Sequence, residues 1–126
     1  MDFLDSNIIV QAFYENKNTE KCQEIIKNGG LTDTLVLTEA FHIIEKITNK
    51  ERAEKAIKGI LKSNVEIIVL DVNLIFESLK RINHYNLSFY DTIHYTCALL
   101  NNCTSILSYD KDFDNEKNLE IKRKEP

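Results

Sequence analysis

Residues 1–7 read Met1-Asp2-Phe3-Leu4-Asp5-Ser6-Asn7, a short apolar run that ends at an aspartate, followed by a small hydroxyl residue and an asparagine. Such a run predicts a first β-strand. A second apolar run, residues 105–108, leads in the same way to Asp110. Ligand sites of open α/β sheets lie at the carboxyl ends of the strands. We therefore expect Asp5 and Asp110 to converge on one edge of a sheet, although they are far apart in the sequence.

Helical and strand-like segments alternate between these two runs. Residues 65–70 are rich in β-branched side chains and predict a buried strand. A helix is predicted over residues 34–48, where apolar residues recur at helical spacing: Val36, Ala40, Ile43, Ile44 and Ile47. The other expected helices are residues 7–15, 19–28, 51–62, about 71–84 and 88–101, and short strands are expected at 31–32 and 119–122. Strands separated by helices need crossover connections, so the sequence predicts an α/β fold with a small, mostly parallel β-sheet flanked by helices.

Length and composition favour one soluble globular domain that spans residues 1–126. Hydrophobic residues make up 43% of the chain and charged residues 29%, which is the profile of a chain that buries a core. No signal peptide and no membrane helix is expected, because no leader pattern and no long apolar run is visible. The net charge of −4 argues against a bulk basic surface for nucleic acid. It does not exclude an enzyme that reaches phosphates through bound metal ions.

The cysteines and histidines offer no competing site. Cys22, Cys97 and Cys103 form no CxxC pair and no even disulfide framework, so we expect apolar packing residues in a protein of the reducing cytoplasm. The three histidines are not spaced as zinc ligands. Asp91 and His94 lie one helical turn apart, but we expect His94 to be a helix-face or partly buried residue.

Each acidic candidate has a structural interpretation when it is taken alone. Asp5 can cap the helix that follows it, and Ser88-x-x-Asp91 resembles a capping box. Asp110 opens an acidic stretch, with Asp112 and Asp114, that can be a solvated loop. Glu39 differs, because it lies at the edge of the apolar stripe of its helix. A carboxylate there needs a partner, such as Lys, Arg or a metal ion.

The case for a metal site rests on the acids occurring together. Two follow strand candidates, one lies on the inner edge of a helix, and one opens another helix. Carboxylates a few ångströms apart repel one another unless some are protonated or a cation lies between them. Mg²⁺ and Mn²⁺ prefer oxygen ligands. Ser6, Asn7 and Ser108 are expected to hold the carboxylates or metal-bound waters as supporting residues.

The ordered set of motifs resembles the PIN-domain nuclease family and, within it, the VapC-type toxins of toxin–antitoxin systems. The resemblance covers nearly the whole chain, from the first strand and its Asp-Ser-Asn to Ser108-x-Asp110-x-Asp112-Phe113 near the carboxyl end. Two positions depart from the usual pattern: Thr92 stands where a smaller residue is common, and Ser108 where Thr is more common.

The resemblance implies a fold, an activity and partners. The fold is a PIN-like α/β/α domain, and the reaction is metal-dependent hydrolysis of RNA with Mg²⁺ or Mn²⁺. The implied metal ligands and catalytic residues are Asp5, Glu39, Asp91 and Asp110, with Asp112 as an auxiliary candidate. The implied partners are an RNA substrate, a second copy of the chain and a cognate antitoxin, with no membrane. The apolar residues Ile8, Ile9, Phe13 and Tyr14 are candidates for a contact surface or, for most of them, for the core.

Several other functions are compatible with parts of the pattern. A haloacid-dehalogenase-like phosphatase needs a second Asp where this chain has Asn7. A response-regulator receiver could use Asp71, but the accompanying early acidic pair and late Lys are not convincing. Within the PIN family, an RNA-processing nuclease outside a toxin–antitoxin pair and a non-catalytic binding module stay open as alternatives.

Overall fold

The computed structural model describes residues 1–126 and contains one five-stranded sheet in the order β3-β2-β1-β4-β5. All four neighbouring pairs are parallel. The strands are β1 (Asp2–Leu4), β2 (Gly30–Asp33), β3 (Val65–Ile68), β4 (Ser105–Leu107) and β5 (Lys122–Lys124). The predicted α/β fold is therefore confirmed, and β1, the first strand in sequence, is the central strand.

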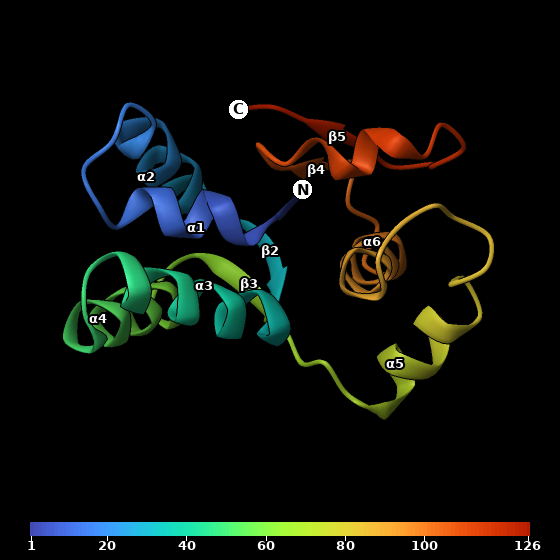
Figure 1. The fold of residues 1–126 in the computed structure, drawn as a ribbon, viewed down its shortest axis with the longest axis horizontal. Coiled ribbons are helices and arrows are strands. Elements are labelled where there is room, and N and C mark those ends of the chain that lie inside the picture. Colours follow the sequence, from blue (N-terminus) through green and yellow to red (C-terminus); the bar gives the residue numbers. More distant parts are fainter.

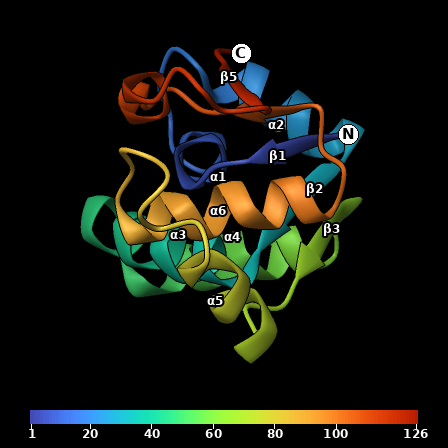
Figure 2. The same cartoon turned by 90° about the vertical axis from the view of Figure 1, so that its right-hand side faces the viewer.

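Helices cover both faces of the sheet (Figure 1). The helical elements are α1 (Ser6–Ala12), α2 (Thr19–Asn28), α3 (Thr34–Ile47), α4 (Lys50–Leu61), α5 (Val72–Leu79), α6 (Phe89–Leu100) and a 3₁₀ turn, η1 (Lys111–Asn115). Helices α1 to α4 lie on one side, and α5 and α6 on the other. Figure 2 shows α6 running along the face of the sheet with α5 packed outside it. None of the helices is long and apolar enough to cross a membrane.

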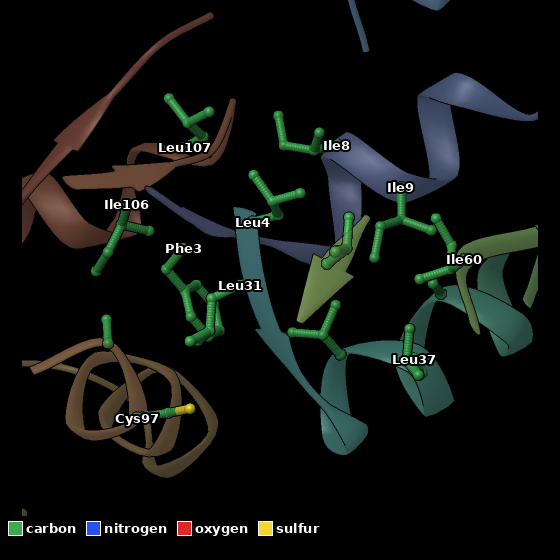
Figure 3. Close-up of a cluster of buried hydrophobic side chains, with 14 of the residues drawn as sticks. Phe3, Leu4, Ile8, Ile9, Leu31, Leu37, Ile60, Cys97, Ile106 and Leu107 are labelled. Atoms are coloured by element: carbon green, nitrogen blue, oxygen red, sulfur yellow. The ribbon is translucent and has the colours of Figure 1, made fainter. Parts of the chain in front are cut away.

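The core follows the alternation of side chains along the central strand. Phe3 points towards α6 and Leu4 towards Ile8 on α1 (Figure 3), as expected when successive strand residues face opposite sides. Ile8 and Ile9 are fully buried. They therefore belong to the core and are not the contact surface that the sequence left open. The three cysteines are free and buried, so their prediction as packing residues is confirmed.

Several predicted boundaries were wrong, each for a local reason. α1 ends at Ala12 instead of residue 15, because the side-chain amide of Asn16 donates to the carbonyls of Gln11 and Tyr14 and holds a turn. α5 ends at Leu79 instead of about 84, and residues 80–84 form turns. The last strand is Lys122–Lys124, not residues 119–122.

The last strand was predicted too early in the chain, because buried apolar residues precede it without pairing to another strand. Leu119 and Ile121 are buried, but the backbone that pairs with β4 begins at Lys122, opposite Ser105. The predicted apolar stripe of α3 included Ile43 and Ile47, but these residues are 37% and 49% exposed. The helix therefore buries a narrower face than its sequence suggests.

The start of β2 depends on a glycine. Gly30 has φ +151°, and a Cβ there would lie 3.1 Å from the Asp2 carbonyl oxygen. Gly30→Ala should therefore lower the free energy of unfolding by about 1–3 kcal/mol. Gly59, inside α4, is the matched control, since a Cβ there meets only the Phe13 ring at 3.6 Å. Gly59→Ala should raise stability by about 0.5–1 kcal/mol, and equal effects in urea denaturation would contradict this account.

Candidate active site

Asp5 is the buried centre of the acidic edge. It follows β1, is 5% exposed, and caps α1 by accepting from the Ser6 backbone N–H at 2.8 Å. Its second oxygen accepts from the Ser108 hydroxyl at 2.7 Å and from the Asn7 amide at 3.4 Å. Both oxygens are thus held by the protein, and the capping and site interpretations of Asp5 do not exclude each other.

Ser108 links the ends of two strands. Leu4 of β1 pairs with Leu107 of β4, which places Ser108 beside Asp5. The Ser108 hydroxyl also accepts from the Asn7 side-chain amide and from the Asp110 backbone N–H, each at 3.0 Å. Asp5 and the loop that carries Asp110 therefore share one hydrogen-bond network at the carboxyl edge of the sheet, as the sequence led us to expect.

Asp110 precedes the 3₁₀ turn η1 that follows β4, and Asp112 lies inside that turn. One carboxylate oxygen of Asp110 accepts from the backbone N–H of Asp112 at 3.0 Å and caps η1. Asp114 is held elsewhere, because Arg123 donates two hydrogen bonds to its carboxylate at 3.1 and 3.0 Å. Of the three acids in this stretch, Asp114 is thus neutralised by a cation.

Asp91 joins the cluster from the first turn of α6. The Asp91 backbone N–H donates to the Ser88 hydroxyl at 3.1 Å. This is one of the two hydrogen bonds of the predicted capping box. The carboxylate of Asp91 accepts no hydrogen bond from the protein. Burial raises the pKa of Asp91 to about 6, with further raising from the charges of Asp5, Asp110 and Asp112 and an opposing effect from His94.

Burial also raises the pKa of Asp5, against the lowering effects of the His94 charge and of the hydrogen bonds from Ser108 and Ser6. The charge of Glu39 adds to the raising. The acids are thus close enough to act on one another, and the site carries more negative charge than its surroundings offset.

Glu39 has a partner that the sequence did not identify. Its Oε1 lies 2.9 Å from Nε2 of His94, and Nδ1 of the same ring lies 2.8 Å from Oδ2 of Asp33. A ring with a carboxylate on each nitrogen donates from both only as an imidazolium. Burial alone would lower the pKa of His94, but the hydrogen bonds that its ring donates to Asp33 and Glu39 outweigh burial and raise the value to about 10.

We expected His94 to lie on a helix face or to be partly buried. This was wrong, because its side chain is only 1% exposed. Asp33 is also fully buried, and it caps α3 by accepting from the Val36 N–H at 2.8 Å. The sequence offers only weak signals for these residues, because His94 lies one turn after Asp91 and Asp33 is a further acid at the end of a strand. Neither signal pairs the two residues.

The site fits a metal ion by the type of its donor atoms, not by their present spacing. No three His, Cys, Asp or Glu side chains are gathered closely enough here to hold a metal ion. One oxygen of Glu39 is engaged by His94, and one of Asp110 by the η1 backbone. The donors are nevertheless all oxygen, and Asp5 and Asp91 both have raised pKa values. A hard divalent cation would offset the repulsion among these carboxylates, so the donor set fits such an ion.

The comparisons with known proteins agree with the fold. The PIN domain model matches residues 3–118, and the chain belongs to this family. None of the curated proteins matches the chain in sequence.

Three similar solved structures support the same fold. The Mycobacterium tuberculosis sarcin-ricin loop cleaving toxin VapC20 has a TM-score of 0.74 at 15% identity, over 90% of this chain and 93% of that one. A Klebsiella pneumoniae toxin–antitoxin complex has a TM-score of 0.71 at 16% identity, over 97% of this chain and 95% of that one. VapBC2 from Rickettsia felis, bound to a promoter DNA fragment, has a TM-score of 0.70 at 16% identity, over 98% of this chain and 97% of that one.

Asp91→Asn should stabilise the metal-free protein. The folded chain holds this proton to about pH 6, against an ordinary pKa of 3.8. The folded state therefore binds more protons than the unfolded state between these values, and stability falls as pH rises through this window. With EDTA at pH 7.5, the variant should gain about 1–2 kcal/mol of unfolding free energy in urea. The gain should vanish at pH 3.5, and a gain of equal size at both pH values would refute the electrostatic cause.

His94→Leu should destabilise the protein, in a higher pH window. The His94 pKa is raised to about 10 from an ordinary 6.5. Its stabilising contribution is therefore full below pH 6.5 and is lost as pH rises through 10. The variant should lose about 3–5 kcal/mol near pH 6.5, because Asp33 stays buried without a counter-charge. The deficit should shrink by pH 10. Exposed His42→Leu is the control, and a deficit that does not change with pH would contradict the imidazolium assignment.

Proposed function

We propose that this protein is a Mg²⁺- or Mn²⁺-dependent endoribonuclease, the toxin of a VapBC-type toxin–antitoxin pair. The observation that carries the proposal is the meeting of Asp5 and the loop of Asp110 at the carboxyl edge of the sheet, where both are joined through the Ser108 hydroxyl. Asp91 has a pKa of about 6 because it is buried beside Asp5, Asp110 and Asp112. Carboxylates brought together at the carboxyl edge of a parallel sheet, without enough cations to offset them, are suited to a divalent ion.

The side chains have distinct roles in this proposal. Asp5, Asp91 and Asp110 hold the cation, Glu39 contacts it directly or through water, and Asp112 is an auxiliary ligand. When bound, the cation lowers the pKa of a water molecule and offsets charge on the phosphate and the leaving oxygen. No side chain of the protein is needed as a nucleophile.

The supporting residues keep the acids oriented. Ser6 and Ser108 fix the two oxygens of Asp5, and Asn7 ties Ser108 to the same network. His94 holds Oε1 of Glu39, which leaves Oε2 without a protein partner. Since the Glu39 side chain is 31% exposed, this second oxygen can accept a hydrogen bond from water or substrate. The orientation of Asp5 and Glu39 therefore does not depend on the substrate.

The similar structures support the substrate and the partner. One is described as a toxin that cleaves the sarcin-ricin loop, and others as complexes of a toxin with its antitoxin. We extend both features to this chain, together with a cytoplasmic location and a homodimer. The exposed apolar side chains Val72, Phe76 and Leu79 on α5 are available for protein contacts. With a net charge of −4, the chain has no excess of basic residues for unspecific RNA binding.

Asp5→Asn tests the proposal with little change of shape. The amide removes a charge from the cluster and should lower the Mn²⁺-dependent cleavage rate of a structured RNA about 100-fold or more. Asp71→Asn is the matched control. Asp71 caps α5 by accepting from the Leu74 N–H at 2.8 Å, a role that Asn also fills. It should cleave like the wild type.

Circular dichroism and thermal melting check that both variants are folded. The ribonuclease proposal is contradicted if folded Asp5→Asn cleaves RNA at the wild-type rate. It is equally contradicted if EDTA leaves wild-type cleavage unchanged. Wild-type protein that binds RNA but never cuts it would favour the non-catalytic binding module.

A further inference from the structure

A groove of about 340 Å³ adjoins the acidic cluster between α3 and α6. It is lined by Leu35, Thr38, Glu39, His42 and Tyr90. Its volume lies within the range of roughly 300–1,000 Å³ of small-ligand sites. Glu39 belongs both to this groove and to the acidic cluster, so whatever occupies the groove lies next to the proposed reaction centre.

Tyr90 is the prominent side chain of the groove. It is 60% exposed, and neither an aromatic neighbour nor a hydrogen bond holds its ring. Two hydrogen bonds fix the backbone around it at the start of α6. The Ser88 hydroxyl accepts from the Asp91 N–H, and the Thr92 hydroxyl donates to the Ser88 carbonyl at 2.8 Å. The aromatic ring is therefore attached to a rigid helix start, immediately beside a proposed metal ligand.

We propose that this groove binds an unpaired nucleobase of the RNA next to the scissile phosphate, with the base stacked on Tyr90. The inference rests on the proposed ribonuclease function and names how that site holds its substrate. Thr38 and His42 lie on the opposite wall, on α3. The Thr38 hydroxyl donates to the Thr34 carbonyl at 2.9 Å and can still accept from a base, and the His42 imidazole can meet the polar edge of the same base. One stacked base beside the acids would position the adjoining phosphodiester bond.

Charge selects a base over a phosphate as the occupant. The groove contains Glu39 and no Lys or Arg, so a phosphate there would be repelled. A nucleobase is neutral and offers a π-face to an aromatic ring, and this stacking does not depend on basic residues. It also suits a chain with a net charge of −4. The base must be unpaired, because a base inside an RNA helix does not expose its face.

Steady-state cleavage of an RNA hairpin with an unpaired loop, in Mn²⁺, tests the groove. Tyr90→Ala should raise KM about tenfold and change kcat less than twofold, because the ring holds substrate and is itself no ligand of the proposed ion. Tyr90→Phe, which keeps the aromatic face, should restore the wild-type KM. Leu61→Ala is the control for loss of an exposed apolar side chain, since Leu61 is 60% exposed at the end of α4 and outside the groove.

A binding measurement separates this inference from the proposed function. A loop carrying 2-aminopurine, a fluorescent base quenched by stacking, is titrated into the intact protein with EDTA, where no cleavage occurs. Quenching by wild type and Tyr90→Phe, but not by Tyr90→Ala, supports the groove even if cleavage is never found. Equal quenching or equal KM for Tyr90→Ala overturns it and leaves the ribonuclease untouched. A change in oligomeric state in place of KM would assign the groove to a second copy of the chain and also overturn it.

Discussion

The hydrogen bond from Ser108 to Asp5, 2.7 Å long and buried, is the contact on which the site depends. It joins the residues that follow two adjacent parallel strands, and the register Leu4 opposite Leu107 makes it possible. Asp5 also starts α1, so the carboxylate with the most influence on the cluster is part of the fold itself. The active edge and the core therefore form together.

The same arrangement carries an electrostatic cost that the protein only partly offsets. The imidazolium of His94 lies between Asp33 and Glu39 and lowers the pKa of Asp5 and Asp91 against larger raising effects. Repulsion remains among Asp91, Asp5 and the acids of η1. Stability given up at a site in this way is common where function needs charges close together, and it is the reason a cation is expected there.

Local sequence patterns and topology rules predicted most of the fold and part of the candidate site. Alternating apolar strands and helices predicted the parallel sheet, and acids after the first and fourth strands predicted that Asp5 and Asp110 meet at one edge. The Asp33–His94–Glu39 contact was not predictable in this way, because 61 and 55 residues separate His94 from its partners. No helical or strand period relates such positions. Strand pairing likewise decided between Leu119 and Lys122 at the last strand, which apolar character alone could not.

The central claim is that the acidic edge binds a divalent cation through carboxylates that must first lose their protons. Calorimetric titration of Mn²⁺ into the wild-type protein at pH 7.5 and at pH 5 tests it most directly. Because the pKa of Asp91 is about 6, the account predicts clear binding at pH 7.5 and much weaker binding at pH 5, with protons released on binding. Absence of binding at pH 7.5, or equal affinity at the two pH values, would contradict it.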